Sequence, residues 1–106
     1  MHDIKKDITR AARKKVLYTL HALHQMNKAE RMISPGEIME VIDRGEIIED
    51  YPENQKGHSC LVSARTSLNR SVHVVCSPKD DYLVIITAYI PSEDEWEEGF
   101  KRRQKR

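Results

Sequence analysis

The chain has 106 residues, of which 39% are hydrophobic and 33% charged, and its formal net charge at pH 7 is +1. This length supports one hydrophobic core, so we expect a single domain over residues 1–106. No run of eighteen apolar residues exists and the charged N-terminus lacks the apolar stretch of a signal peptide, which excludes a membrane span and predicts a cytoplasmic protein.

Charge is unevenly distributed along the chain. Residues 1–32 hold eight Lys/Arg against three Asp/Glu, whereas residues 33–56 hold two against seven. An acidic stretch, SEDEWEEGF, precedes a basic tail at 101–106, KRRQKR. This segregation fits a protein that binds a polyanion on one side and a basic partner on another, and it equally fits solvated helix faces.

The first part of the chain is predicted to be helical. Residues 3–14 place their apolar side chains on one stripe, and Asp3 is a suitable N-cap. The stretch KVLYT at 15–19 fits either a continuation of this helix or a break, after which Thr19 caps a new one. The helical pattern resumes to about residue 28, with three side chains expected to face inward: Leu20, Leu23 and Met26.

A third helix is predicted for SPGEIMEVIDRG. Ser34 caps it, Pro35 takes the first helical position and Glu37 completes a capping box. Gly45 ends the helix. Its buried stripe is expected to consist of Ile38, Val41 and Ile42.

Four strand-like runs follow, and their short connections favour antiparallel neighbours. A last helix is predicted for PSEDEWEEGFKRRQKR, capped at Ser92, with Trp96 packed against the domain. The predicted fold class is therefore α+β, with N-terminal helices, a four-stranded antiparallel meander and a C-terminal helix. The strand-like runs are EIIEDYP (46–52), HSCLVSART (58–66), RSVHVVCSP (70–78) and DYLVIITAYIP (81–91).

Strand alternation sorts these residues into an apolar face against the helices and a polar face. On the last strand, strict alternation also places Leu83 and Ile85 on the polar face. An arginine, a histidine, a tyrosine and hydroxyls on neighbouring strands can bind a phosphate and transfer protons, although the open face of an antiparallel sheet is ordinarily polar. The polar set is Ser63, Arg65, His73, Thr87 and Tyr89.

Histidine and cysteine spacing does not favour a metal site. His73 and Cys76 lie three residues apart and so point to opposite faces of a strand. This argues against one metal site formed by these two residues together with His58 and Cys60. Both cysteines fall on the predicted core face, and we interpret them as buried, reduced thiols. His21 and His24 have helical spacing, but no carboxylate accompanies both. We expect no metal and no other cofactor.

Three stretches together, HALHQMNKAERMIS, GEIIEDYP and HVVCSPKDDYLVIITAY, resemble a family of small bacterial proteins known mainly as a domain of unknown function. The family pattern is H-A-L-x-R-M, x-E-R-x-I-S, G-E-I-I-E-x-Y-P, H-V-V and I-I-T-x-Y, and the resemblance covers about residues 16–103. Gln25 replaces the first arginine of the pattern, and the residues KA at 28–29 lengthen the following link. The residues that match are His21, Arg31, His73, Thr87 and Tyr89.

This family is similar to the RelE-like toxin superfamily, which implies N-terminal helices, a small antiparallel sheet and a basic concave face. Some members are encoded beside small antitoxins that carry a zinc finger. The resemblance therefore implies a type II toxin that cleaves messenger RNA, with free or ribosome-bound mRNA as its substrate and a cognate antitoxin as its protein partner.

Cleavage of RNA without a metal requires a base for the ribose 2′-OH, an acid for the leaving 5′-oxygen and cations for the charged phosphorane. On this hypothesis His21 or His73 is the base or the acid, and Tyr89 is a second donor. Arg31 and Arg65 hold the phosphate. The further residues expected to contact RNA are Ser63, Thr87, Lys14, Lys15, Arg102 and Arg103.

Two other hypotheses stay open at this point. The rival is a non-catalytic module with the same fold that binds a protein or regulatory partner, and a metal-dependent hydrolase is a more distant alternative. His21 also fits a histidine that simply packs between helices, and the polar strand residues also fit a solvated sheet face.

Overall fold

The computed structural model describes residues 3–55, 57–92, 95–97 and 99–103 of the chain. Its elements are, in chain order, α1 (Ile4–Lys14), β1 (Val16–Tyr18), α2 (Leu20–Met26), the 3₁₀ turn η1 (Ala29–Arg31), α3 (Pro35–Arg44), β2 (Glu46–Tyr51), β3 (Ser59–Arg65), β4 (Ser71–Pro78) and β5 (Leu83–Tyr89).

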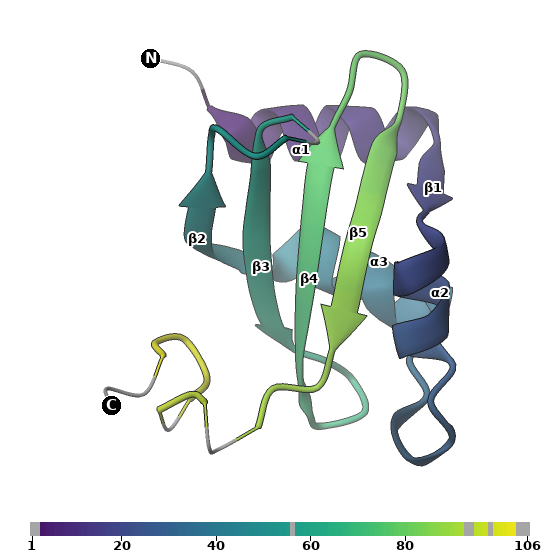
Figure 1. Cartoon of the computed structure of the whole chain (residues 1–106), viewed down its shortest axis with the longest axis vertical. Coiled ribbons are helices and arrows are strands. Elements are labelled where there is room, and N and C mark those ends of the chain that lie inside the picture. Colours follow the sequence, from purple (N-terminus) through teal and green to yellow (C-terminus); the bar gives the residue numbers. More distant parts are fainter. Residues whose placement is uncertain (1–2, 56, 93–94, 98, 104–106) are drawn as a thin grey trace.

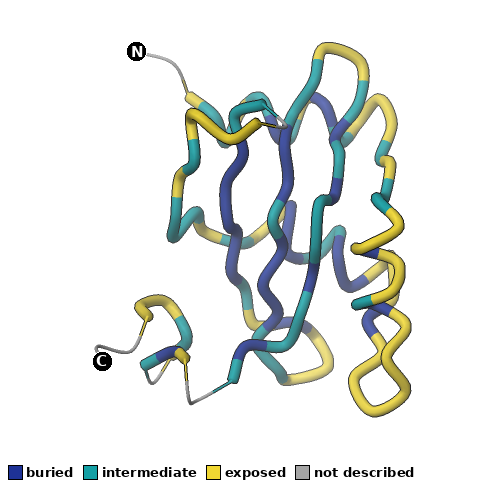
Figure 2. The backbone as a smooth tube through the Cα atoms, in the orientation of Figure 1, coloured by how far each residue is buried: buried dark blue, intermediate teal, exposed yellow. Residues whose placement is uncertain are grey.

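Within these residues, five strands form one mixed sheet in the order β1-β5-β4-β3-β2. Helices α1 and α3 cover one face of the sheet, and α2 lies beside its β1 edge (Figure 1). The middle strands are the most buried part of the chain (Figure 2). In the described part of the chain, no helix is long and apolar enough to cross a membrane.

The predicted four-stranded meander is wrong because a fifth strand joins the sheet. β1 pairs in parallel with β5, so that Val16 lies opposite Leu83. The Leu83 amide donates to the Lys15 carbonyl over 2.8 Å, and the Thr19 amide donates to the Ile85 carbonyl over 3.1 Å. The edge of β5 thus provides hydrogen-bond partners for the backbone of KVLYT. These partners cannot be recognised from the local sequence pattern. Of the two readings of this stretch, the break is correct, since the Thr19 side chain caps α2.

The predicted C-terminal helix is also wrong. Amides of Glu95 and Trp96 bond to the Ser92 carbonyl, but Gly99 and Phe100 then adopt left-handed backbone angles, with φ of 87° and 59°. These angles turn the chain back, and Trp96 pairs with Arg103 in an isolated antiparallel bridge. Trp96 is only 2% exposed, as expected for a residue packed against the domain. Residues 104–106 of the basic tail lie outside the described residues.

The helical predictions for the N-terminal part are confirmed for α1 and partly wrong for α2. Asp3 caps α1 through its carboxylate, and Ile8 is buried. In α2, however, Leu20 is 85% and Leu23 40% exposed. Thr19 is tied to β5 by its amide and by its hydroxyl, which orients α2 so that other residues face the core. The buried residues of α2 are Ala22 and Met26.

Helix α3 begins and ends where the sequence predicts, but its capping box does not form. The Ser34 hydroxyl accepts a hydrogen bond from the Glu37 amide over 3.1 Å. The Glu37 carboxylate turns away from the cap and instead accepts hydrogen bonds from Arg70 over 2.6 and 2.8 Å and from Thr66 over 2.7 Å. The predicted buried stripe is confirmed: Ile38, Val41 and Ile42.

The predicted faces of β5 are wrong for part of the strand because the strand contains a β-bulge. His73 of β4 lies opposite Tyr89 and Val75 lies opposite Thr87, whereas Cys76 lies opposite Ile85, so Ile86 is an extra residue. The bulge turns Leu83 and Ile85 toward the helices, where both are fully buried. Strict alternation cannot anticipate this change of face within one strand.

Candidate active site

His73 lies on the sheet face opposite α1, and a cavity lies on either side of it. A row of paired residues crosses this face: Tyr89 on β5, His73 on β4, Ser63 on β3 and Glu46 on β2. The first cavity lies at the Tyr89 end of the row, and the second lies at the Ser63 and Glu46 end.

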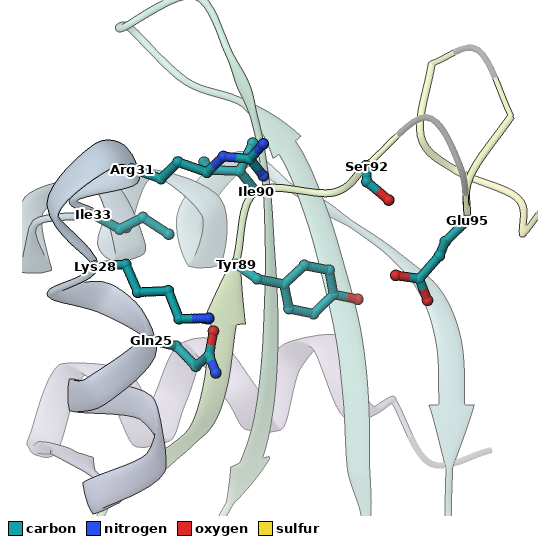
Figure 3. A pocket seen from close by; sticks show the side chains of 8 residues that line it. All are labelled: Gln25, Lys28, Arg31, Ile33, Tyr89, Ile90, Ser92 and Glu95. Atoms are coloured by element: carbon teal, nitrogen blue, oxygen red, sulfur yellow. The ribbon is translucent and has the colours of Figure 1, made fainter.

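The first cavity has a volume of about 260 Å³ and lies between the α2–η1 segment and the end of β5. The segment is held in place by two backbone hydrogen bonds, from the Arg31 amide to the Lys28 carbonyl over 3.0 Å and from the Ile33 amide to the Met26 carbonyl over 2.8 Å. Figure 3 shows Tyr89 between these residues and Glu95. The lining residues are Gln25, Lys28, Arg31, Ile33, Tyr89, Ile90, Ser92 and Glu95.

His73 lies behind Tyr89 and is 0% exposed. Its Nε2 lies 2.7 Å from the Phe100 carbonyl oxygen, which can only accept, so Nε2 carries the proton. Burial lowers the pKa of His73, which favours the neutral ring. In this tautomer Nδ1 is an acceptor, and it lies 3.3 Å from the Tyr89 hydroxyl. The Tyr89 hydroxyl is therefore the donor of this hydrogen bond.

Tyr89 keeps its proton at neutral pH. Burial raises the pKa of Tyr89 to about 12, because the phenolate would lose much of its hydration. The side chain is half-buried, and its hydroxyl end points toward the side of the cavity where Glu95 lies (Figure 3). Tyr89 thus presents a neutral phenol whose hydroxyl donates to His73, and its ring lies between Lys28 and Arg31 on one side and Glu95 on the other (Figure 3).

The residues 95–97 and 99–103, which we call the C-terminal strap, cover His73. The Trp96 ring meets the His73 ring edge-on, with centroids 4.5 Å apart. Arg103 donates two hydrogen bonds to Glu49 on β2, over 2.6 and 3.0 Å, and its guanidinium lies 4.6 Å from the Trp96 ring centroid. These hydrogen bonds from Arg103 lower the pKa of Glu49. The strap therefore closes the sheet face over His73 and forms a wall of both cavities.

The second cavity has a volume of about 640 Å³ and is lined by the ends of α3, β3 and β4 together with the strap. The described part of its lining has three cations and one carboxylate, and Lys101 pairs with Glu46. Its lining residues are Arg44, Glu46, Ser63, Ala64, Arg65, Ser71, Gly99, Phe100 and Lys101.

The structure brings together only some of the residues that the sequence nominated. Arg31 and Tyr89 share the first cavity, and Ser63 and Arg65 share the second. His73 is too deeply buried to contact a substrate directly. Thr87 lies on the same open face, opposite Val75.

The other nominated residues do not line the first cavity. His21 is exposed on α2, one helical turn before the lining residue Gln25. Lys14 ends α1 and bonds to the Asp80 carbonyl over 3.1 Å, which places it near the β4–β5 turn. Lys15 follows it, exposed, as the α1 C-cap. Arg102 is exposed in the strap, and Arg103 is engaged with Glu49.

Two charged residues that line the first cavity were missed by sequence reasoning: Lys28 and Glu95. Lys28 lies in the segment that leads to Arg31, and its position three residues before Arg31 was a usable signal. Glu95 had no such signal, because it was assigned to a helix that does not form.

The buried thiols are confirmed as free cysteines, Cys60 and Cys76, which lie opposite each other on β3 and β4. Among the described residues, no three or more His, Cys, Asp or Glu side chains form a group that could hold a metal ion.

A protein-family model described as Domain of unknown function (DUF4258) matches residues 18–90. The chain belongs to the DUF4258 family. Neither the curated proteins nor the solved structures contain a match. The DUF4258 match includes Arg31, His73 and Tyr89 but ends before the strap, which supplies Glu95 to the first cavity and Phe100 to the second.

Proposed function

We propose that this chain is a metal-independent endoribonuclease that acts as the toxin of a toxin–antitoxin pair. The observation that carries the proposal is the first cavity, where Lys28 and Arg31 stand beside the neutral phenol of Tyr89 and the carboxylate of Glu95. Phosphate-binding cations, a proton donor and a proton acceptor are the groups that cleavage of an RNA phosphodiester requires.

The two cations bind the scissile phosphate. The Arg31 guanidinium has a planar fork that matches two phosphate oxygens, and Lys28 adds a compact positive charge. Both are exposed at the rim of the cavity, so an RNA strand reaches them without any rearrangement of the core. They also stabilise the additional negative charge of the phosphorane.

Glu95 and Tyr89 transfer the protons. Glu95 takes the proton from the ribose 2′-OH, the 2′-oxygen forms a bond to phosphorus, and the bond from phosphorus to the 5′-oxygen breaks. When RNA is bound, the Tyr89 hydroxyl turns its proton from His73 Nδ1 to the leaving 5′-oxygen and donates it there. The products are a 2′,3′-cyclic phosphate and a 5′-hydroxyl, and proton transfer from Glu95 to Tyr89 restores the enzyme. His73 is a positioning residue, because its Nδ1 holds the Tyr89 hydroxyl.

Exposed apolar side chains on β1 and α2 support a protein partner. Leu17 on β1 and Leu20 and Leu23 on α2 are all exposed, and α2 also contributes Gln25 to the cavity. Contiguous exposed apolar side chains are typical of protein–protein contacts. An antitoxin bound to these side chains would contact α2, the helix that contributes Gln25 to the first cavity.

The second candidate function is RNA binding without cleavage. It is favoured by the burial of His73 and by the absence of histidine among the residues that line the first cavity. Such a module would keep the phosphate-binding role of Arg31 and Lys28 and would not use Tyr89 as an acid.

The deciding experiment is incubation of the purified chain with end-labelled single-stranded RNA in the presence of EDTA. We expect fragments ending in 2′,3′-cyclic phosphate, a large loss of cleavage in Tyr89→Phe and Glu95→Gln, and full cleavage in the control Arg10→Ala on α1. His21→Ala tests the sequence-based role of His21 in the same assay. If RNA stays intact both free and on translating ribosomes, the nuclease is refuted and the binding module takes its place.

A further inference from the structure

We infer that the second cavity binds another nucleotide of the RNA strand, about three positions along from the scissile phosphate in the first cavity. The preferred substrate is then a single strand of at least about four nucleotides rather than a dinucleotide. This inference rests on the proposed function for the position of the scissile phosphate, and it assigns a second contact to the same strand.

The charge of the second cavity favours an anion. Among the described residues, its lining includes three cations, Arg44, Arg65 and Lys101, and one carboxylate, Glu46. Arg44 is engaged with Glu40 over 2.5 Å, and Lys101 pairs with Glu46. These two ion pairs leave the Arg65 charge without a carboxylate partner among the described residues.

Arg65 is held in a conformation suited to bind phosphate. Its Nε donates to the Asn69 Oδ1 over 2.9 Å, and Asn69 has a left-handed φ of 61° in the β3–β4 turn. Among the described residues, the terminal nitrogens of this guanidinium have no hydrogen-bond partner. A planar fork with one edge fixed and the other edge open is suited to a bidentate contact with a phosphate.

The second cavity also has room and a surface for a base. Its volume of about 640 Å³ falls within the range of small-molecule sites. Phe100 is half-buried in its wall, and aromatic side chains bind single-stranded RNA by stacking on its bases. A phosphate on Arg65 and a base on Phe100 together make up a nucleotide contact.

The spacing of the two cavities sets the length of the strand. Tyr89 and Ser63 lie in one cross-strand row with His73 between them, so they are two strand spacings apart, or about 10 Å. A stacked nucleic-acid strand rises about 3.4 Å per nucleotide, so this distance corresponds to about three nucleotide steps, which join about four nucleotides. The strap runs between the two cavities, with Glu95 lining one and Phe100 the other.

The test is binding of fluorescein-labelled, fully 2′-O-methylated RNA, which has no 2′-OH and cannot be cleaved, to the full chain. Dinucleotides and hexanucleotides are compared by fluorescence anisotropy. We expect the hexanucleotide to bind more tightly, Arg65→Ala to weaken its binding about tenfold, and dinucleotide binding to be unaffected by this change. Arg10→Ala, a matched change of one exposed arginine on α1, should leave both affinities nearly unchanged.

Three results would overturn the inference: equal binding of both lengths, no effect of Arg65→Ala, or an equal loss in Arg10→Ala, which would indicate general electrostatic attraction only. Because the probe cannot be cleaved, the outcome is separate from catalysis. Binding that depends on Arg65 with no cleavage of unmodified RNA would refute the proposed nuclease alone. Cleavage without any dependence on Arg65 would refute the second contact alone.

Discussion

His73 donates a hydrogen bond from Nε2 to the Phe100 carbonyl over 2.7 Å, and this bond decides which ring nitrogen faces Tyr89. A residue of the strap, outside the region matched by the family model, thereby sets the hydrogen bonding of a residue inside it. The strap thus contributes to the first cavity in two ways. It positions Tyr89 through His73, and it supplies the lining residue Glu95.

Replacing Tyr89 by phenylalanine should separate catalysis from folding. Removal of the proton donor is expected to slow cleavage by about 10²- to 10⁴-fold. The lost hydrogen bond to His73 should cost about 1–3 kcal/mol of unfolding free energy. Single-turnover cleavage at saturating RNA and thermal unfolding measure the two effects. Tyr82→Phe, in a half-buried tyrosine outside the site, is the control, and an equal rate loss there would contradict the role of Tyr89.

Protonation of His73 should make the chain less stable in mild acid. Burial lowers the pKa of His73 in the folded state, whereas in the unfolded chain a histidine titrates near about 6.5. The unfolded state therefore binds more protons between these two values, and the free energy of unfolding falls as the pH drops below about 6.5. Urea unfolding at a series of pH values measures this slope. His73→Gln should remove the part of this pH dependence that comes from His73, whereas His24→Gln, at an exposed histidine, should leave the pH dependence unchanged.

The pair formed by Glu49 and Arg103 should hold the strap on the sheet. The pair is bidentate and partly shielded, so a double-mutant cycle with Glu49→Gln and Arg103→Met is expected to give a coupling of about 1 kcal/mol. The exposed pair Lys14 and Asp81, with its longer separation of 3.7 Å, is the comparison and should give a coupling near zero. Equal couplings would mean that the strap does not depend on Arg103.

Glu37 joins α3 to the β3–β4 turn, and its loss should be among the more destabilising polar changes. The carboxylate is 2% exposed and bonded to Arg70 and Thr66, so Glu37→Gln leaves Arg70 without its counter-charge and should cost about 3 kcal/mol. The Arg70 hydrogen bond lowers the pKa of Glu37, so its contribution, present above about pH 4.5, should be lost as the pH falls through the folded-state pKa. Urea unfolding checks both effects; a similar loss in Glu40→Gln would contradict a special role for Glu37.

Two glycines of the same region should respond to alanine in opposite directions. At Gly45 a Cβ would lie 2.4 Å from the Val41 carbonyl oxygen and 2.6 Å from Val62 Cγ1, so Gly45→Ala should destabilise the fold by about 1–3 kcal/mol. At Gly36, within α3, the nearest atom would be 3.7 Å away, so alanine should stabilise the helix by about 0.5–1 kcal/mol. Thermal unfolding of the two variants decides the matter, and equal shifts would contradict the close approach at Gly45.

The sequence by itself determined the elements whose causes are local. The Asp3 and Ser34 caps, the buried stripe of α3 and the positions of β2 to β5 depend on residues within a few positions of each other. It also indicated Arg31 and Tyr89, because their side chains have the chemistry for a phosphate site. Lys28 was within reach of the same reasoning.

Only the tertiary structure decided which of these groups meet. β1 exists because the free edge of β5 satisfies its backbone, the Ile86 bulge reverses the face of β5, and the strap folds back because His73 and Glu49 bind it. Each outcome depends on hydrogen-bond partners far away in the sequence. A pattern of neighbouring residues contains no information about such partners, and for that reason the burial of His73 and the arrival of Glu95 at the cavity could be found only in the folded chain.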